Sequence, residues 1–357
     1  MSKHVATVAE VFRSENLLVR GATGFSGEVC FVTFDAFTDY HTLDREGFGQ
    51  RFFQQNGIDA FHIISRNNEW FQLEELPEAC RLTACSASRY RRVFSYGSSM
   101  GGYGAIRFGR WAGAQRAFAL SPQFSIDSRK APFEKRWRHQ ARRTRFIHEG
   151  GEKAVAQAII VYDPLSVDAR HADLFRQITE VIDVRLPHCG HPSGPYLAEL
   201  GLLSSALTAL AGDALDAMAL QREARRRRRE AAQFYINLAL RARSPRIKAE
   251  LGARAVQLAP GNAETRAHYA VFAAAAGRRH EALAAMDMAE VLEPGRPHMK
   301  VQRSLVYELL GDLSAAVDVM EALMARGPTL RSHGARLRHL KARQLVARLR
   351  KRLPRLG

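Results

Sequence analysis

The chain has 357 residues, a formal net charge of +17 at pH 7 and a hydrophobic content of 46%. This length allows two domains, and this hydrophobic content supplies a sizeable core, which excludes a disordered chain. No apolar run approaches the roughly 18 residues of a membrane span, and residues 1–20 lack the apolar segment of a signal peptide, so we expect a cytoplasmic protein.

The positive charge is unevenly distributed. Residues 1–211 hold 25 basic against 22 acidic residues, and residues 212–357 hold 28 against 14. An excess of this kind predicts an anionic partner or surface, and it does not choose among nucleic acid, acidic lipid headgroups and an acidic glycan.

The cysteines argue against a disulfide framework and against structural zinc. They show no C-x-x-C spacing and are few for a chain of this length. The four cysteines, Cys30, Cys80, Cys85 and Cys189, agree with a reducing compartment. Cys80 and Cys85 could both face one helix groove, and we expect them to be buried thiols.

The first ninety residues alternate between strand and helix patterns. Residues 5–14 and 17–20 predict an opening hairpin, and a third strand covers 28–34. The pattern then predicts a helix, a strand and a second helix, at 45–55, 60–64 and 73–89. This alternation favours an α/β fold.

Residues 93–105 predict a buried strand, a tight turn and a helix. The turn Gly97-Ser98-Ser99-Met100-Gly101 is a G-x-S-x-G sequence, in which Ser99 would occupy a strained position that raises its hydroxyl above the sheet edge. The glycines are needed because a Cβ there would strike the neighbouring strand and helix. The N–H of Met100 would face an oxyanion. A purely structural turn is the alternative, and the apolar strand and helix on either side favour a nucleophile.

Together with the elements after it, this stretch resembles the α/β-hydrolase fold over about residues 1–212. The resemblance implies a doubly wound, mostly parallel sheet and acyl or ester chemistry by a Ser-His-Asp triad, without naming a substrate. It also implies a second oxyanion N–H from the loop after the third strand, at Asp35 or Ala36. Because the HGGG signature of lipases is absent, an ordinary strand-to-loop junction is the alternative.

The loop after the strand at 60–64 is a candidate substrate contact. Parallel strands end at one edge of a sheet, and ligands bind outside that edge. Arg66, Asn67 and Trp70 could therefore contact the substrate near Ser99. A solvated loop with Trp70 packed on the domain is the alternative.

A basic insertion at about 124–150 follows a short strand at 115–120. Residues 124–148 hold eight basic and two acidic residues, interleaved with Phe133, Trp137 and Phe146. In hydrolases of this fold an insertion here becomes a lid, and a basic, aromatic lid would favour an anionic or membrane-bound substrate. The alternative is a solvated basic helix whose aromatic residues lie on the core.

The acid and the base of the implied triad each have two candidates. The acid belongs after the apolar strand at 158–162, and we favour Asp168 over Asp163, which would then cap the loop or helix. The base belongs after the strand at 181–186, and we prefer His191, which follows a glycine, to His188. The His-x-x-His pair lacks a carboxylate or cysteine to complete a metal site, so we expect no metal and no cofactor.

The C-terminal part repeats every 34 residues. The period relates Pro260, Pro294 and Pro328, and it also relates Gly277 to Gly311 and Ala282 to Ala316. A glycine between two helices and a proline after the second resemble the tetratricopeptide repeat, although its first-helix positions are poorly kept.

The expected domains follow from these features. We assign residues 1–212 to the hydrolase-like domain, 213–230 to a basic linker helix and 231–357 to the repeats. A single helix is expected over 193–220. A basic helix at 331–352 would cap the array and pack its apolar residues on the last repeat, in preference to acting as a membrane-surface or nucleic-acid helix. Those apolar residues are Leu337, Leu340, Leu345, Val346 and Leu349.

The sequence therefore predicts a serine hydrolase of the esterase or thioesterase class, fused to a repeat module that binds a protein. Its substrate would be a small-molecule or glycan ester, which could be anionic, and nucleic acid is disfavoured as a partner. An acyltransferase, a glycan-modifying esterase and a non-catalytic scaffold that binds an anionic partner are the alternatives. Hydrolysis and transfer share an acyl-enzyme and differ in whether water or another hydroxyl enters.

Overall fold

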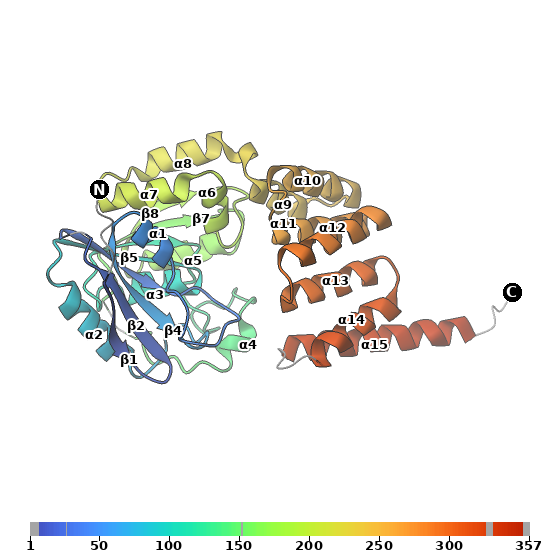
Figure 1. The fold of residues 1–357 in the computed structure, drawn as a ribbon, viewed down its shortest axis with the longest axis horizontal. Helices are drawn as coiled ribbons and strands as arrows, with labels where there is room; N and C mark the ends of the chain where they lie inside the picture. The colour runs from blue at the N-terminus through green and yellow to red at the C-terminus, as the bar shows by residue number, and fades with distance from the viewer. Residues whose placement is uncertain (1–6, 26, 151–152, 326–330, 353–357) are drawn as a thin grey trace. The chain divides into compact units, whose positions relative to one another are not determined.

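A computed structural model describes residues 7–25, 27–150, 153–325 and 331–352. The chain divides into two compact units, Met1–Arg228 and Arg229–Gly357. The first unit contains the sheet and the helices packed on it, and the regular elements of the second unit are all helices in the part that the structure describes (Figure 1).

Within the described residues, eight strands form one sheet in the order β1-β2-β4-β3-β5-β6-β7-β8. The hairpin β1 (Thr7–Arg13) and β2 (Leu17–Thr23) is antiparallel, and β2 is antiparallel to β4 (Asp59–Ser65). All later neighbours are parallel, which confirms the expected α/β fold with a mostly parallel sheet. The remaining strands are β3 (Val29–Phe34), β5 (Arg92–Ser98), β6 (Arg116–Leu120), β7 (Gln157–Tyr162) and β8 (Glu180–Arg185).

Both faces of the sheet are buried. In β2, Leu17 and Val19 belong to the main core, whereas Leu18 packs with Leu43 and Ile64 in a separate cluster. Successive residues of a strand point to opposite faces, so these two clusters lie on the two sides of the sheet. This double burial explains why the central strands read as continuous apolar runs.

The helices of the first unit connect the strands and cover them. Among them, α3 packs against β3, β5 and β6, and α5 packs against β7 and β8. They are α1 (Gln50–Gln55), α2 (Leu76–Ala87), α3 (Met100–Arg107), α4 (Arg138–Ala141), α5 (Asp168–Phe175), α6 (Gly194–Glu199), α7 (Leu202–Ala211) and α8 (Ala217–Arg226).

Two expected helices differ from the structure. The helix predicted over 45–55 begins only at Gln50, after Gly49 with φ 72°. The single helix predicted over 193–220 is broken into α6, α7 and the start of α8, because Gly201 takes φ 67° and Asp216 starts a new helix. The Asp216 side chain accepts hydrogen bonds from the N–H groups of Met218 and Ala219, which makes it an N-cap.

The segment expected to be a linker belongs to the first unit. Helix α8 packs against β8 and α7, and the Tyr196 hydroxyl donates to the Ala224 carbonyl at 2.9 Å. The boundary between the two compact units therefore falls after Arg228, later in the chain than the expected boundary at residue 212.

The second unit consists of consecutive helices. Each neighbouring pair from α9 to α15 is in contact. The two alanines related by the 34-residue period, Ala282 and Ala316, are fully buried, each in an apolar cluster. The helices are α9 (Ala232–Arg241), α10 (Pro245–Leu258), α11 (Ala263–Ala275), α12 (Arg279–Leu292), α13 (Pro297–Leu309), α14 (Leu313–Ala325) and α15 (Arg331–Arg352).

Among the described side chains of the last helix, apolar residues of its first half pack on the neighbouring helix α14. Leu337 and Leu340 join the cluster of α14, as expected. The prediction was wrong for three later apolar residues, which are about half exposed: Leu345, Val346 and Leu349. Pro328, the third proline of the period, lies outside the described residues.

Of the cysteines, Cys30, Cys80 and Cys189 are buried and Cys85 is exposed, so the expected burial was wrong for Cys85. Four residues separate it from Cys80, and on α2 that spacing leaves Cys85 at the solvent side. In the part of the chain that the structure describes, no helix has the length and apolar character needed to cross a bilayer.

Candidate active site

The turn between β5 and α3 holds Ser99 in a strained conformation. Its backbone angles are φ 53° and ψ −114°, an unfavourable region for a residue with a side chain. Its N–H donates to the Leu120 carbonyl at 2.8 Å, which fixes the turn against β6. A Cβ on Gly97 would lie 2.2 Å from the Gly101 oxygen, and a Cβ on Gly101 would lie 2.2 Å from the Phe34 oxygen. Both glycines are therefore sterically required.

Three of the sequence-predicted residues lie in one line of hydrogen bonds. The Ser99 Oγ is 3.0 Å from His191 Nε2, and His191 Nδ1 is 2.9 Å from Asp168 Oδ2. Since a carboxylate only accepts, Nδ1 carries the proton and Nε2 is left to accept the serine hydroxyl. The three residues follow β5, β7 and β8, whose parallel directions bring their carboxyl ends to one edge of the sheet.

The second acid candidate, Asp163, supports the histidine loop. It is fully buried, its Oδ1 accepts from the Leu165 N–H at 2.9 Å, and its Oδ2 lies 3.4 Å from the Gly190 N. Asp163 thus ties the end of β7 to the residue before His191. The other histidine of the pair, His188, sits in the turn with φ 64°.

The carboxylate of Asp168 has a second partner that the sequence analysis missed. Arg136 Nη2 is 2.9 Å from Asp168 Oδ1 and 2.6 Å from Glu134 Oε2. Burial acts to raise the pKa of Asp168, but the hydrogen bond from His191 and the charge of Arg136 outweigh it and hold that pKa below its ordinary value. Asp168 is therefore a carboxylate shared by two donors.

Glu134 extends this arrangement to a buried histidine. His171 Nε2 is 2.9 Å from Glu134 Oε2, and His171 Nδ1 accepts from the Phe124 N–H at 3.1 Å. Burial opposes the charge of Glu134, yet the bonds from His171 and Arg136 lower its pKa to about 2. Burial lowers the pKa of His171, which is consistent with a neutral ring that donates from Nε2.

Of the expected oxyanion donors, the structure excludes Asp35. Its N–H donates to the Ile63 carbonyl at 3.2 Å, as part of the contact between β3 and β4, and is not available to a ligand. Its buried carboxyl pairs with Arg45, and burial raises its pKa to about 7. Met100 opens α3 directly after Ser99, and Ala36 follows Asp35 in the loop after β3.

A side-chain amide lies against the nucleophile candidate. Gln123 Nε2 donates to Ser99 Oγ at 2.9 Å and lies 3.4 Å from His191 Nε2. The other end of the amide, Oε1, is 3.4 Å from Trp70 Nε1, and both residues are fully buried. The sequence analysis did not single out Gln123. The available signal was its position three residues after the carboxyl end of β6, on the ligand edge of the sheet.

The expected substrate contacts have other partners. Trp70 is buried, and its Nε1–H donates to Gln123 Oε1. Its link to Ser99 is therefore indirect, through the Gln123 amide. Arg66 Nε donates to the Glu15 carbonyl at 2.6 Å, at the turn between β1 and β2. The backbone carbonyl of Asn67 accepts a hydrogen bond from the Ser65 hydroxyl at 2.8 Å. These bonds show a structural use for each of the three residues.

The basic insertion contains one short helix, α4, in its described residues, and its aromatic residues point inward. Trp137 packs against Phe37 and Trp70, with ring centroids 4.9 and 5.3 Å apart. Phe133 packs against His171 at 4.8 Å, and Phe146 lies against the main core. Trp137 and Phe146 therefore lie on the core, as the alternative to a lid expects, and the basic helix of that alternative is limited to the four residues of α4 in the described part of the insertion.

No cluster of three or more His, Cys, Asp or Glu side chains suited to a metal ion occurs among the described residues.

No protein-family model matches the chain, and no curated protein matches it. Among solved structures, it is similar to an esterase of Pyrococcus furiosus, with 12% identity and a TM-score of 0.38 over 57% of this chain and 90% of that one. Est1E from Butyrivibrio proteoclasticus gives 12% identity and a TM-score of 0.38 over 57% and 99%. The capsule O-acetyltransferase of Neisseria meningitidis serogroup A gives 11% and 0.38 over 57% and 100%.

Proposed function

We propose that the chain is a serine hydrolase that cleaves a carboxylic ester through an acyl-enzyme on Ser99. The observation that carries the proposal is the line of hydrogen bonds from Ser99 through His191 to Asp168, at 3.0 and 2.9 Å. The strained turn at Ser99 supports it, because such strain persists only where the surrounding structure enforces it and is typical of active sites. The sheet order and the chain order Ser, Asp, His support an α/β-hydrolase assignment.

In the attack step, His191 Nε2 accepts the proton of the Ser99 hydroxyl while Oγ bonds to the ester carbonyl carbon. The imidazolium that forms is stabilised by Asp168, which stays ionised because Arg136 and His191 both favour its charged form. His191 then gives the proton to the departing alcohol, which leaves the acyl group on Ser99. Water, activated by the same histidine, releases the acid.

Three donors would stabilise negative charge during these steps. The N–H of Met100, at the start of α3, and that of Ala36 are the proposed donors to the carbonyl oxyanion. Gln123 Nε2 already donates to Ser99 Oγ in the free protein, so it would stabilise the charge that develops on that oxygen as the proton leaves.

Transfer of the acyl group to a second hydroxyl would use the same acyl-enzyme. An acceptor alcohol would then take the place of water in the second step. Competition between water and an added alcohol during turnover of one ester measures which reaction the site favours.

For the second unit, we propose a tetratricopeptide-like array that binds an acidic protein surface. The 34-residue period, the burial of Ala282 and Ala316, and the helix pairs α11/α12 and α13/α14 support this proposal. Stacked helix pairs contact mainly their neighbours and build an extended binding surface.

A fluorophosphonate probe tests the proposed hydrolase directly, because it labels an activated serine covalently. The full chain should be labelled, and Ser99→Ala should abolish labelling. Ser98→Ala is the matched control. Ser98 is the neighbouring buried serine, and it is the last residue of β5, opposite Leu120 of β6. Equal labelling of the wild type and Ser99→Ala would refute the proposed nucleophile.

A further inference from the structure

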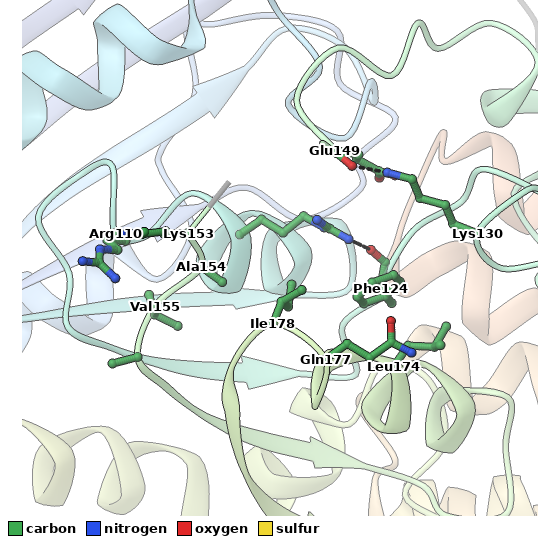
Figure 2. A pocket seen from close by; sticks show the side chains of 12 residues that line it. Arg110, Phe124, Lys130, Glu149, Lys153, Ala154, Val155, Leu174, Gln177 and Ile178 are labelled. Carbon is green, nitrogen blue, oxygen red and sulfur yellow. Dashed lines mark hydrogen bonds and ion pairs between the residues drawn. The ribbon is translucent and has the colours of Figure 1, made fainter. Parts of the chain in front are cut away.

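A cavity of about 720 Å³ opens beside the last turn of α3, and Ser99, His191 and Asp168 are not among the residues that line it. Its walls come from the end of α3, from the basic insertion, from the loop that enters β7 at its amino end, and from the end of α5 (Figure 2). The charged side chains that line it are Arg107, Arg110, Lys130, Glu149 and Lys153. A volume of this size fits a small organic ligand.

Arg107 is a buried cation whose charge lacks a carboxylate partner in the part of the chain that the structure describes. Only 6% of the residue is exposed. Its Nε and Nη2 donate to the Phe124 carbonyl at 3.1 and 3.0 Å, and its guanidinium lies over the Phe124 ring at 4.5 Å. A guanidinium has five N–H donors, so donors remain after these two bonds. Because burying a charge without an opposite charge is costly, this residue favours an anion in the cavity.

The one carboxylate among the described lining residues already has hydrogen-bond and ion-pair partners. Glu149 is buried, and its two oxygens accept from the Tyr103 and Ser125 hydroxyls at 2.9 and 2.8 Å. Lys130 also pairs with it, with Nζ 3.2 Å from Oε2, as Figure 2 shows. Glu149 therefore neutralises Lys130 and leaves the other cations uncompensated.

The remaining cations stand at the opening. Arg110 and Lys153 are exposed, and in the described structure neither forms an ion pair with a carboxylate. A buried guanidinium and two exposed cations thus line the same cavity, whose apolar walls include Phe124 and Val155. This arrangement suits a ligand that carries anionic groups on a small carbon skeleton.

We infer that this cavity is a binding site for a small molecule that carries phosphoryl or carboxylate groups. One oxyanion binds the free N–H groups of Arg107, and a second is held at the opening by Arg110 and Lys153. The site is separate from the proposed catalytic line, and it does not require that Ser99 be a nucleophile.

Calorimetric titration of the full chain in a low-salt buffer tests the inference, with glucose 6-phosphate, inorganic phosphate, citrate and uncharged glucose as probes. Saturable binding of an anionic probe, weakened by added salt, is expected, and glucose should not bind. The phosphate and citrate arms distinguish phosphoryl from carboxylate recognition. If none of the anionic probes binds saturably, the inference is overturned.

Variants locate the binding. Arg110→Gln/Lys153→Gln changes only exposed residues and should weaken binding about tenfold or more, because two charged contacts are lost. Arg91→Gln/Arg243→Gln removes the same charge from exposed positions outside the cavity and is the matched control. Equal affinity in these two double variants would overturn the inference.

The buried cation is tested by Arg107→Met, which keeps an apolar chain beside Phe124. If its thermal unfolding shows that it is folded, it should not bind the probe, and undiminished binding would overturn the role of Arg107. If this variant does not fold, the comparison of the two double variants still decides the inference.

Discussion

Gln123→Met should slow acylation of Ser99 while leaving the protein folded. Methionine has nearly the same length as glutamine but lacks the amide that donates to Ser99 Oγ at 2.9 Å. The substitution therefore separates the hydrogen bond from the space that the side chain fills. Ser99, His191 and Asp168 stay in place.

The size of the effect follows from the charge on Oγ. The hydroxyl is neutral in the free protein and becomes negative as its proton moves to His191, so the bond from Gln123 strengthens in the transition state. A hydrogen bond to a charged group contributes about 1.5–3 kcal/mol. The same bond to the neutral hydroxyl already contributes about 0.5–1.5 kcal/mol in the free protein, so the transition state gains about 1–1.5 kcal/mol more. Since each 1.36 kcal/mol is tenfold in rate, kcat/KM should fall about 5- to 15-fold.

The assay is kcat/KM on p-nitrophenyl acetate, together with the second-order rate of labelling by a fluorophosphonate. Both depend on attack by Ser99 and should fall by similar factors. Thermal unfolding is measured in parallel, because Gln123→Met leaves the buried Trp70 N–H, which faces Gln123 Oε1 at 3.4 Å, without an acceptor. That loss should cost about 1–3 kcal/mol of stability.

The double variant Trp70→Phe/Gln123→Met is the control for stability. It removes the unpaired N–H, which regains about 1–3 kcal/mol, but it also removes ring volume that packs against Trp137, so its unfolding separates these two terms. It should not recover activity. A folded Gln123→Met protein with activity within about twofold of the wild type would refute the reasoning. Recovery of activity in the double variant would show that the loss came from misfolding.

Four further outcomes are expected. His191→Ala should lower kcat on the same ester by orders of magnitude, because the Ser99 hydroxyl would stay protonated. A mild loss would show that His191 is not the general base. Asp168→Asn should reduce kcat far more than Asp163→Asn, which keeps an oxygen for the Gly190 N–H, and the reverse order would exchange their roles. Glu134, whose pKa is lowered from 4.5 to about 2, stabilises the fold above pH 4.5 and loses that contribution as the pH falls toward 2; in urea unfolding, Glu134→Gln should remove up to about 3 kcal/mol of this pH dependence, and an unchanged slope would contradict it. A chain ending at Arg228, the end of the first compact unit, should hydrolyse p-nitrophenyl acetate as the full chain does, and a folded but inactive fragment would show that the second unit shapes the proposed site.

The strands and the turn at Ser99 could be predicted from the sequence because their signals are local. The apolar runs, Gly97 and Gly101 all act within a few residues of the serine. Choosing between the two aspartates was harder, since both follow β7 within six residues and only the fold decides which one meets His191.

The rest of the site depends on contacts between distant segments. Gln123 meets Ser99 across 24 residues, and Arg136 meets Asp168 across 32. No periodicity or spacing signals such pairs. Asp35 also depends on such a contact, because its N–H donates to the Ile63 carbonyl where β3 pairs with β4. The sequence alone does not specify the register of these two strands.

The contacts of the basic insertion bear on how a substrate reaches Ser99. Arg136 and Glu134 hold the insertion to Asp168 and His171, and Trp137 packs against Trp70. Swinging this segment outward would leave Asp168 as a buried carboxylate without its Arg136 counterion and the buried His171 without its Glu134 acceptor, so such an opening would be rare. This part of the insertion is thus a fixed wall of the site, and a cut within it would disable the acid of the proposed triad even though every residue of that triad is intact.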